Sequence, residues 1–392
     1  MYMTEPRTPP NVTLTPCEPS YARFLSEGMD SLQEAFNLKP TVELVALLDR
    51  SRAAAEALSG DKEGSVTLQL GPETFQIFAT GAKGGFRWRL ANDDMLLMIG
   101  SPSREWTISC RYTSGGLWEH GTDALRARAF AALRPYTQQI GSDVVRVSRC
   151  DWCFDFYSPA LTREMIPRIG EQVVTHSGVK TGEVLSLMGA GGLAQTLTIG
   201  SKSGLQVQLY DKSREIDEAS GKTWFWDIWI AGLDGEYPWE DRPRDVWRLE
   251  IRWSADFLKD RNIRRPDELR AALPQLITES LSMRRLTVPT GDSNRRRWPM
   301  HPIWSAAFTM HLTREILPLG RKVTGRRGVL VDRGVAQVAG ALRSLAELEG
   351  GYDPKRVVSL AERAKARIEA DPDHQKKLEI ARARYSEVDE AR

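Results

Sequence analysis

The stretch that decides the fold is DVVRVSRCDWCFDFY, residues 143–157. Its apolar and polar residues alternate, which predicts a β-strand whose successive side chains point to opposite faces. The apolar face carries Cys150, Trp152, Phe154 and Phe156. The other face carries Arg149, Asp151, Cys153 and Asp155. Carboxylates in the middle of a central strand cost free energy unless they are paired or bound to a metal. An Arg–Asp ion pair at the sheet rim and a metal site are therefore both open interpretations.

Short β-rich runs continue this pattern on both sides of the central stretch. VTLQL, FQIFAT, GFRWRL, MLLMIG and EWTISCRY lie between Val66 and Tyr112 and are separated by Gly, Pro and Asp, which predicts an antiparallel meander. QTLTIG, LQVQLYDK and VWRLEIRW give three further strands. The expected fold class is therefore α+β, a mostly antiparallel sheet with flanking helices and with helical N- and C-terminal extensions.

Helical periodicity marks the segments between and beyond these strands. Residues 21–58 predict two helices, and residues 122–139 predict one that begins with Thr122 as its N-cap. The other expected helices cover residues 160–175, 266–286, 336–348 and 354–391.

A tyrosine follows the central strand in a second polar stretch, TLTIGSKSGLQVQLYDKSREI, residues 196–216. Alternation places Tyr210 on the same face as Gln206, Gln208 and Lys212. A phenol has an ordinary pKa of about 10, so it acts as a nucleophile only beside a cation or a base. Lys212 is the nearest candidate for that role. A surface tyrosine beside solvated charges is the alternative.

The third polar stretch is DVWRLEIRW, residues 245–253. Glu250 lies between Arg248 and Arg252 on its polar face. A ladder of ion pairs and a functional carboxylate are both compatible with this pattern.

Taken in order, the three stretches resemble the replication initiation factor family. The resemblance rests on an R-x-D-x-x-x-D strand, an IGSKS segment followed by YDK and Glu, and an R-x-E strand, and it spans roughly residues 65–258. The family includes plasmid rolling-circle initiators, filamentous-phage initiators and related relaxases. It implies that Tyr210 attacks one strand of a double-strand plasmid or phage origin, leaving a 5′-phosphotyrosyl link and a free 3′-hydroxyl.

The resemblance also implies roles for the neighbouring polar residues. The implied catalytic residues are Tyr210, Lys212, Glu215 and Arg149, and the implied ligands of Mg²⁺ or Mn²⁺ are Asp151, Asp155 and Glu250. Residues four apart on a regular strand lie about 13 Å apart. We therefore expect one of Asp151 and Asp155 to bind the metal and the other to orient an arginine or a lysine. The five histidines include no His-x-His pair, so carboxylates must hold any metal.

A basic stretch follows these motifs. Eleven Arg or Lys residues stand against three acids between Arg284 and Arg333. Its candidate DNA contacts are Arg295, Arg296, Arg297, Arg321, Lys322, Arg326 and Arg327. A solvated basic loop is the alternative. Six tryptophans between Trp224 and Trp253 either stack on unpaired bases or pack the fold.

The sequence divides into four expected parts. These are an N-terminal helical segment (1–60), a catalytic α+β domain (61–286), a basic DNA-contact segment (287–335) and a charged helical tail (336–392). No apolar leader or membrane span is found, and four cysteines do not make a disulfide scaffold, so we expect a cytoplasmic protein without a membrane partner.

The expected partners are origin DNA, a host polymerase and a host helicase, since no G-x-x-x-x-G-K-[ST] motif is present. A homodimer is left open. Three other functions compete with origin nicking. A relaxase would use the same chemistry on a transfer origin, and a copy-control protein would bind the origin without cutting it. A tyrosine recombinase, suggested by HLTR at residues 311–314 and by Tyr352, would need no metal.

Overall fold

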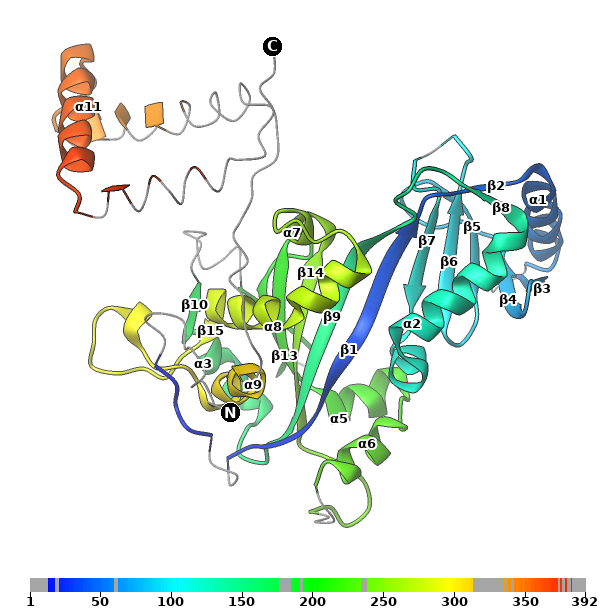
Figure 1. Cartoon of the computed structure of the whole chain (residues 1–392). Helices are drawn as coiled ribbons and strands as arrows, with labels where there is room; N and C mark the ends of the chain where they lie inside the picture. The colour runs from blue at the N-terminus through cyan, green and yellow to red at the C-terminus, as the bar shows by residue number, and fades with distance from the viewer. Residues whose placement is uncertain are drawn as a thin grey trace, which may run out of the picture. The chain divides into compact units, whose positions relative to one another are not determined.

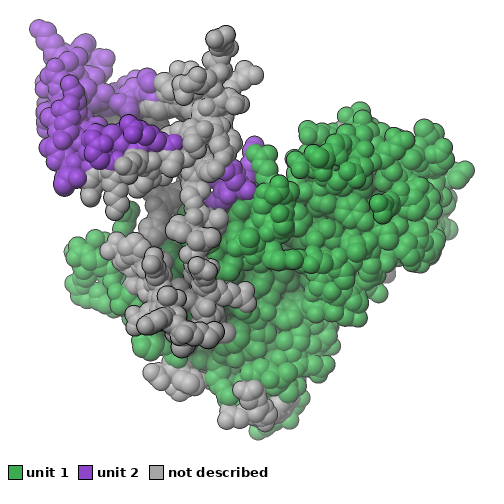
Figure 2. All heavy atoms as spheres, in the orientation of Figure 1, with its two compact units in different colours: residues 1–258, 263–318 green, residues 259–262, 319–392 purple. Residues whose placement is uncertain are grey.

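The computed structural model divides the chain into two compact units (Figure 2). The first unit contains residues 1–258 and 263–318, and the second contains residues 259–262 and 319–392. The structure describes residues 13–17, 21–59, 63–103, 105–175, 185–190, 193–233, 238–312, 335, 338–339, 342–343, 345–347, 349–372, 374–375, 378 and 382.

An 11-stranded sheet forms the centre of the first unit, and every neighbouring pair in it is antiparallel (Figure 1). In sheet order the strands are β11 (Leu185–Ala190), β12 (Leu193–Gly200), β13 (Leu205–Asp211), β14 (Val246–Ser254), β9 (Val145–Tyr157), β1 (Arg23–Phe36), β7 (Ile108–Tyr112), β6 (Met95–Gly100), β5 (Phe86–Ala91), β4 (Glu73–Phe78) and β3 (Ser65–Leu70). The predicted meander and the three later strands are confirmed, and so is the α+β fold class.

The strand β1 joins the two halves of this sheet, and here the sequence-based prediction of a helix is wrong. β1 pairs with β9 on one side and with β7 on the other. Its register against β9 shifts between Phe24 and Ser26, between Met29 and Ser31, and between Gln33 and Glu34. The first two shifts place an extra residue in β1, Leu25 and Asp30, and the third places Ser148 as an extra residue in β9. The buried residues are therefore spaced as on a helix although the backbone is extended. Of the two helices predicted over residues 21–58, only α1 (Val42–Ala57) forms, with Thr41 as its N-cap.

Two further helices differ from their predicted bounds. α2 (Ser114–Leu133) begins eight residues before Thr122, and its N-cap is Thr113, whose side chain accepts from Gly116 N. Gly121, with φ +76°, interrupts it, which explains why the sequence pattern resumes only at Thr122. The predicted helix at 160–175 shrinks to α3 (Ile166–Gly170), because the β-branched residues that follow form β10 (Val173–Thr175).

The remaining elements of the first unit cover or extend the sheet. α8 (Pro266–Met283) crosses β9 and β13, and its Ser280 Oγ accepts a hydrogen bond from Trp253 Nε1 over 2.8 Å (Figure 1). The shorter helices are α5 (Lys212–Glu215), α6 (Phe225–Ala231), α7 (Ala255–Lys259) and α9 (Pro302–Leu312). Two small sheets pair β10 with β15 (Arg284–Leu286) and β2 (Leu38–Pro40) with β8 (Thr137–Gln139).

The second unit contains α11 (Pro354–Glu369). Asp353 caps it by accepting from Lys355 N, and Leu360 is its buried residue. This helix confirms the first part of the helix predicted over 354–391. Within the described residues, no helix combines the length and the apolar character needed to cross a membrane.

Candidate active site

Polar residues on four adjacent strands form three rows across one face of the sheet. The rows follow from the pairing of β13, β14, β9 and β1, because directly opposed residues in antiparallel strands lie on the same face. The first row holds Tyr210, Arg248, Asp155 and Ser26. The second row holds Gln208, Glu250, Cys153 and Gly28, and the third holds Gln206, Arg252, Asp151 and Ser31. The three polar stretches of the sequence therefore converge on one surface.

Tyr210 lies at the end of β13 and contacts a carboxylate. Its hydroxyl donates a hydrogen bond to Glu250 Oε2 over 3.0 Å. The side chain is half-buried, and burial together with the negative charge of Glu250 raises the pKa of Tyr210 well above its ordinary value. The phenol is therefore protonated until a base removes its proton.

Lys212 follows Tyr210 at the start of α5 and is buried. Asp211 caps that helix by accepting from Arg214 N over 3.0 Å, which fixes the turn after Tyr210. Lys212 Nζ lies 5.9 Å from the centre of the Tyr210 ring and forms an ion pair with Glu215. Burial and the positive charge of Arg248 lower the pKa of Lys212. Lys212 and Glu215 thus form an ion pair, and Lys212 lies beside the tyrosine.

Arg248 is the buried centre of the first row. Its Nε donates to Asp155 Oδ1 over 2.7 Å and its Nη2 to Asp155 Oδ2 over 2.8 Å. Asp155 also accepts from Trp229 Nε1 over 2.8 Å and from Ser26 Oγ over 3.2 Å. The carboxylate of Asp155 therefore accepts hydrogen bonds from Arg248, Trp229 and Ser26, and it holds the guanidinium of Arg248 in place.

Asp30 on β1 is a site residue that sequence reasoning missed. Arg248 Nη1 contacts Asp30 Oδ1 over 2.6 Å, and Ser114 Oγ donates to the same oxygen over 3.0 Å. Burial raises the pKa of Asp30, but Arg248 and Lys212 outweigh that effect and lower it below its ordinary value. Because residues 21–36 have helical spacing, no signal in the sequence placed Asp30 in the sheet.

Asp151 in the third row is also held by arginines. Arg149 Nε donates to Asp151 Oδ1 over 2.9 Å, and Arg252 Nε donates to Asp151 Oδ2 over 3.3 Å. We expected one of Asp151 and Asp155 to orient an arginine, and in the structure both do. The Arg149–Asp151 ion pair kept open by the sequence is present.

Glu250 lies in the second row, between the arginines of the first and third rows. Arg252 Nη2 contacts Glu250 Oε1 over 3.3 Å. Burial raises the pKa of Glu250, and the negative charges of Asp30 and Asp151 raise it further. A carboxylate with a raised pKa accepts a proton more readily than an ordinary surface glutamate.

Carboxylates are the donors that this face offers to a divalent metal ion. Within the part of the chain that the structure describes, no group of three or more His, Cys, Asp or Glu side chains is arranged to hold a metal ion. Mg²⁺ seldom needs such a cage, because it binds through one or two carboxylates, water and substrate phosphates. Glu250 accepts from Tyr210 and Asp30 accepts from Ser114, so these two carboxylates are the candidates for that smaller donor set.

The basic stretch is described only in part. Arg295, Arg296 and Arg297 form a single 3-10 turn and are exposed. Arg295 donates to Glu171 O and lies 5.2 Å from the centre of the Trp298 ring. The other four candidate contacts lie outside the described residues: Arg321, Lys322, Arg326 and Arg327.

The tryptophans fall into two groups. Trp229, Trp239, Trp247 and Trp253 are buried and pack the fold. Trp224 and Trp226 are only half-buried and pack beside the cluster formed around Phe225 and Trp229. The packing alternative therefore holds for four of the six.

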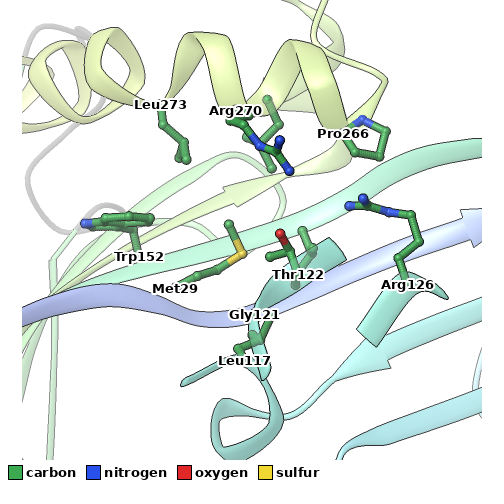
Figure 3. Close-up of a pocket in the computed structure, with 11 residues that line it drawn as sticks. Met29, Leu117, Gly121, Thr122, Arg126, Trp152, Pro266, Arg270 and Leu273 are labelled. Carbon is green, nitrogen blue, oxygen red and sulfur yellow. The ribbon is translucent and has the colours of Figure 1, made fainter. Parts of the chain in front are cut away.

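A pocket of about 230 Å³ lies away from the polar rows (Figure 3). Met29 and Trp152, which are paired across β1 and β9, line it together with Leu273 of α8, and Arg126 and Arg270 lie at its edge. Trp152 points to the opposite face of β9 from Asp151 and Cys153. This pocket is therefore separate from the candidate active site.

Fold and site together define an α+β protein whose antiparallel sheet presents a phenol, carboxylates and guanidinium groups on one face. The rolling circle replication initiator protein from Geobacillus stearothermophilus has a similar structure, with a TM-score of 0.39 and 15% sequence identity. The alignment covers 76% of this chain and 98% of that chain. The sequence matches no protein-family model and no curated protein.

Proposed function

We propose that this protein nicks one strand of a plasmid or phage origin to start rolling-circle replication, with Tyr210 as the nucleophile. The observation that carries the proposal is the hydrogen bond from the Tyr210 hydroxyl to Glu250 at the end of β13, beside buried Lys212 and Arg248. A nucleophile, a base and cations are the groups that phosphoryl transfer needs. The order of the polar motifs along the chain, which resembles that of replication initiation factors, supports the same assignment.

The proposed step transfers a DNA strand to the enzyme. Tyr210 Oη forms a bond to the phosphorus as the bond from that phosphorus to the 3′-oxygen of the preceding nucleotide breaks. Glu250 takes the phenol proton, and the leaving 3′-oxygen acquires a proton from water. The products are a 5′-phosphotyrosyl link and a free 3′-hydroxyl, and reversal of the step closes the strand.

Positive groups around Tyr210 explain why a phenol with a raised pKa is still suited to this reaction. Negative charge grows on the phenol oxygen and the phosphate as Tyr210 is deprotonated and attacks. Lys212 is close to the ring, and Arg248 is held in place by Asp155 and Asp30. Positioned charges of this kind stabilise developing charge without having to reorganise.

We propose that Glu250 and Asp30 hold a divalent cation, Mg²⁺ or Mn²⁺, when DNA is bound. Such an ion would neutralise charge on the scissile phosphate. Asp151 and Asp155 then serve to position Arg252 and Arg248. This assignment puts Asp30 in place of the one aspartate, Asp151 or Asp155, that the sequence led us to expect as a ligand, and Mn²⁺ binding by aspartate variants separates the two assignments.

Rolling-circle initiation defines the proposed partners. The free 3′-hydroxyl would prime a host polymerase, and a host helicase would separate the strands. The exposed arginines at 295–297 would contact origin phosphates. A homodimer would place two tyrosines at one origin.

A plasmid nicking assay tests the proposal. Supercoiled plasmid that carries the cognate origin is incubated with the protein in Mn²⁺ or in chelator, and open circles and protein-linked DNA are measured. We expect nicking in Mn²⁺ that Tyr210→Phe abolishes. Tyr352→Phe is the matched control, because Tyr352 is an exposed tyrosine in the second unit.

The same assay separates the competing functions. Nicking that survives in chelator and depends on Tyr352 would support a recombinase. Origin binding without cleavage would support a copy-control protein. Nicking of a transfer origin in place of the replication origin would identify a relaxase.

A further inference from the structure

A pocket of about 360 Å³ lies between α2 and α6, next to the candidate active site. Gly115, Trp118 and Glu119 of α2 line one side, and Trp224 and Ile228 line the other. Trp118, Trp224 and Ile228 are each half-buried, so their side chains are partly open to solvent. The pocket walls are thus mostly flat and apolar.

Ring contacts connect this pocket to Tyr210. Phe225 stacks on Trp224, with ring centres 3.9 Å apart, and meets Trp118 edge-on at 5.5 Å. Lys212 Nζ lies 5.5 Å from the Phe225 ring centre and 5.9 Å from the Tyr210 ring centre. Buried Lys212 therefore lies near both the ring of the proposed nucleophile and the aromatic wall.

Gly28 of β1 allows this wall to form. A Cβ at Gly28 would come within 2.7 Å of Trp118 Cζ2, so a larger residue would displace the indole. Gly28 belongs to the second polar row, opposite Cys153. The position of Trp118 is therefore set by the same strand that supplies Asp30.

Positive charge lies on the side of the pocket that faces the polar rows. Lys212 and Arg248 both contact the Phe225 ring, with Arg248 Cζ 4.4 Å from its centre. Lys222, two residues before Trp224, acts on Asp30 together with them. Glu119, which also lines the pocket, is exposed. A strand entering the pocket would thus find aromatic rings for its base, and the positive field of two buried, paired cations on the side that faces Tyr210.

We propose that this pocket binds one unpaired base of the DNA strand that Tyr210 attacks, stacked on Trp118 and Trp224. The proposal rests on the proposed function and adds its substrate form, a single strand with an exposed base beside the scissile phosphate. Stacking on aromatic side chains needs no particular base, because every base has a flat face. The pocket fixes the strand, and origin sequence is read elsewhere.

Binding of two oligonucleotides tests the proposal in the Tyr210→Phe protein, which does not cleave. One probe is a labelled 12-nucleotide oligothymidylate, and the other is a 12-unit chain of abasic sites with the same charge. Fluorescence anisotropy should show preference for the probe with bases of about tenfold or more. Trp224→Ala should reduce that preference several-fold and leave abasic binding unchanged.

Gly115→Leu is a second variant that fills the pocket without removing a core ring. A Cβ at Gly115 would meet only Thr113 Oγ1, at 4.0 Å, so the fold has room for the new side chain. Trp106→Ala is the matched control, because Trp106 is half-buried and stacks on Arg146 outside the pocket. Thermal unfolding of each variant checks that it is folded.

The outcomes separate this inference from the proposed function. Base preference that persists in both Trp224→Ala and Gly115→Leu overturns the pocket proposal even if the wild-type protein nicks its origin. If neither probe binds, the pocket proposal is also wrong. A third outcome is a base preference that the pocket variants lose, in a wild-type protein that nicks no origin. That result would support base stacking in the pocket and contradict the proposal that Tyr210 is the nucleophile.

Discussion

The Tyr210 hydroxyl donates to Glu250 over 3.0 Å, although the residue directly opposite Tyr210 on β14 is Arg248. The phenol therefore reaches diagonally across the strand pair to a carboxylate and lies beside a guanidinium that is already occupied by Asp155 and Asp30. This relationship gives the first prediction.

Glu250→Gln should slow origin nicking about 100-fold or more, because the amide cannot accept the phenol proton and is a weaker ligand for the proposed cation. The side chain keeps its size, so DNA binding should be unchanged. The rate of open-circle formation under single-turnover conditions, at saturating Mn²⁺, measures the effect. Glu218→Gln changes an exposed acid and serves as control. A Glu250→Gln protein that nicks at the wild-type rate would show that another group takes the proton.

Arg248→Met should lower the free energy of unfolding by about 3–5 kcal/mol, because it leaves two buried carboxylates without their cation. Arg248 is 0% exposed and contacts both Asp155 and Asp30. Urea unfolding followed by circular dichroism gives the comparison. Arg242→Met breaks an exposed ion pair with Asp217 and should cost at most about 1 kcal/mol. Equal losses in the two variants would contradict the buried role of Arg248.

Asp30→Asn should weaken Mn²⁺ binding at least tenfold, whereas Asp151→Asn should change it little, because Asp30 and Glu250 supply the donors we propose. Isothermal titration of Mn²⁺ in the presence of uncleaved origin oligonucleotide measures both variants. The reverse order of effects would return the metal to Asp151, one of the two aspartates considered from the sequence.

Ala at Arg295, Arg296 and Arg297 together should weaken DNA binding and flatten its salt dependence. Each phosphate contact releases about 0.9 counterions, so the slope of log affinity against log salt should fall by up to about 2.7. Anisotropy titrations of origin DNA over a range of NaCl concentrations give the slope. Arg50→Ala removes an exposed arginine from α1 and should leave the slope unchanged. A triple variant with the wild-type slope would show that these arginines do not contact DNA phosphates and form a solvated basic loop.

His301 should make stability depend on pH. The ring is buried, contacts Tyr21 Oη at 3.1 Å, and burial lowers the pKa of His301 from 6.5 to about 4. Since the folded pKa is the lower one, the unfolded chain binds the proton more tightly. The contribution of neutral, buried His301 to the free energy of unfolding is complete above pH 6.5. It decreases as the pH falls and is lost near pH 4. The linked free energy is about 3 kcal/mol.

Chemical denaturation from pH 7.5 to pH 4 measures this dependence in the wild type and in His301→Gln. The variant should show a shallower loss of stability, by up to about 1.4 kcal/mol per pH unit between the two pKa values. Parallel curves for the two proteins would mean that His301 is not the group that titrates.

The sequence predicted most strands of the sheet because their alternation is regular. β9, β13 and β14 alternate without interruption over the residues that matter, so Tyr210, Glu250 and Asp155 could be placed on a polar face from spacing alone. Their convergence could not, since register between strands distant in sequence depends on tertiary pairing. The structure supplied that register and the ion pairs that follow from it.

The failure at β1 has a local physical cause. Two bulges of β1, at Leu25 and Asp30, interrupt the alternation of its buried residues, which then resembles the helical pattern. Asp30 is the extra residue between the paired positions Met29 and Ser31. Because β1 itself was not predicted as a strand, Asp30 could not be placed in the site. The pocket at Trp118 could not be predicted for the same reason, because Trp118 packs against Gly28 of β1.

The position of β1 at the centre of the sheet also governs how the chain can be made. A hydrogen bond joins Ser26 to Asp155 across 129 positions of sequence, so the earliest strand must wait for β9 to emerge from the ribosome before its second edge is covered. Pairings this distant close large loops and slow folding. During synthesis β1 can pair with β7 first, and the strands that carry the proposed nucleophile and its neighbours are added afterwards. A nascent chain arrested before residue 145 would therefore have an unpaired edge on β1, where β9 should pair, and such an edge is prone to aggregation.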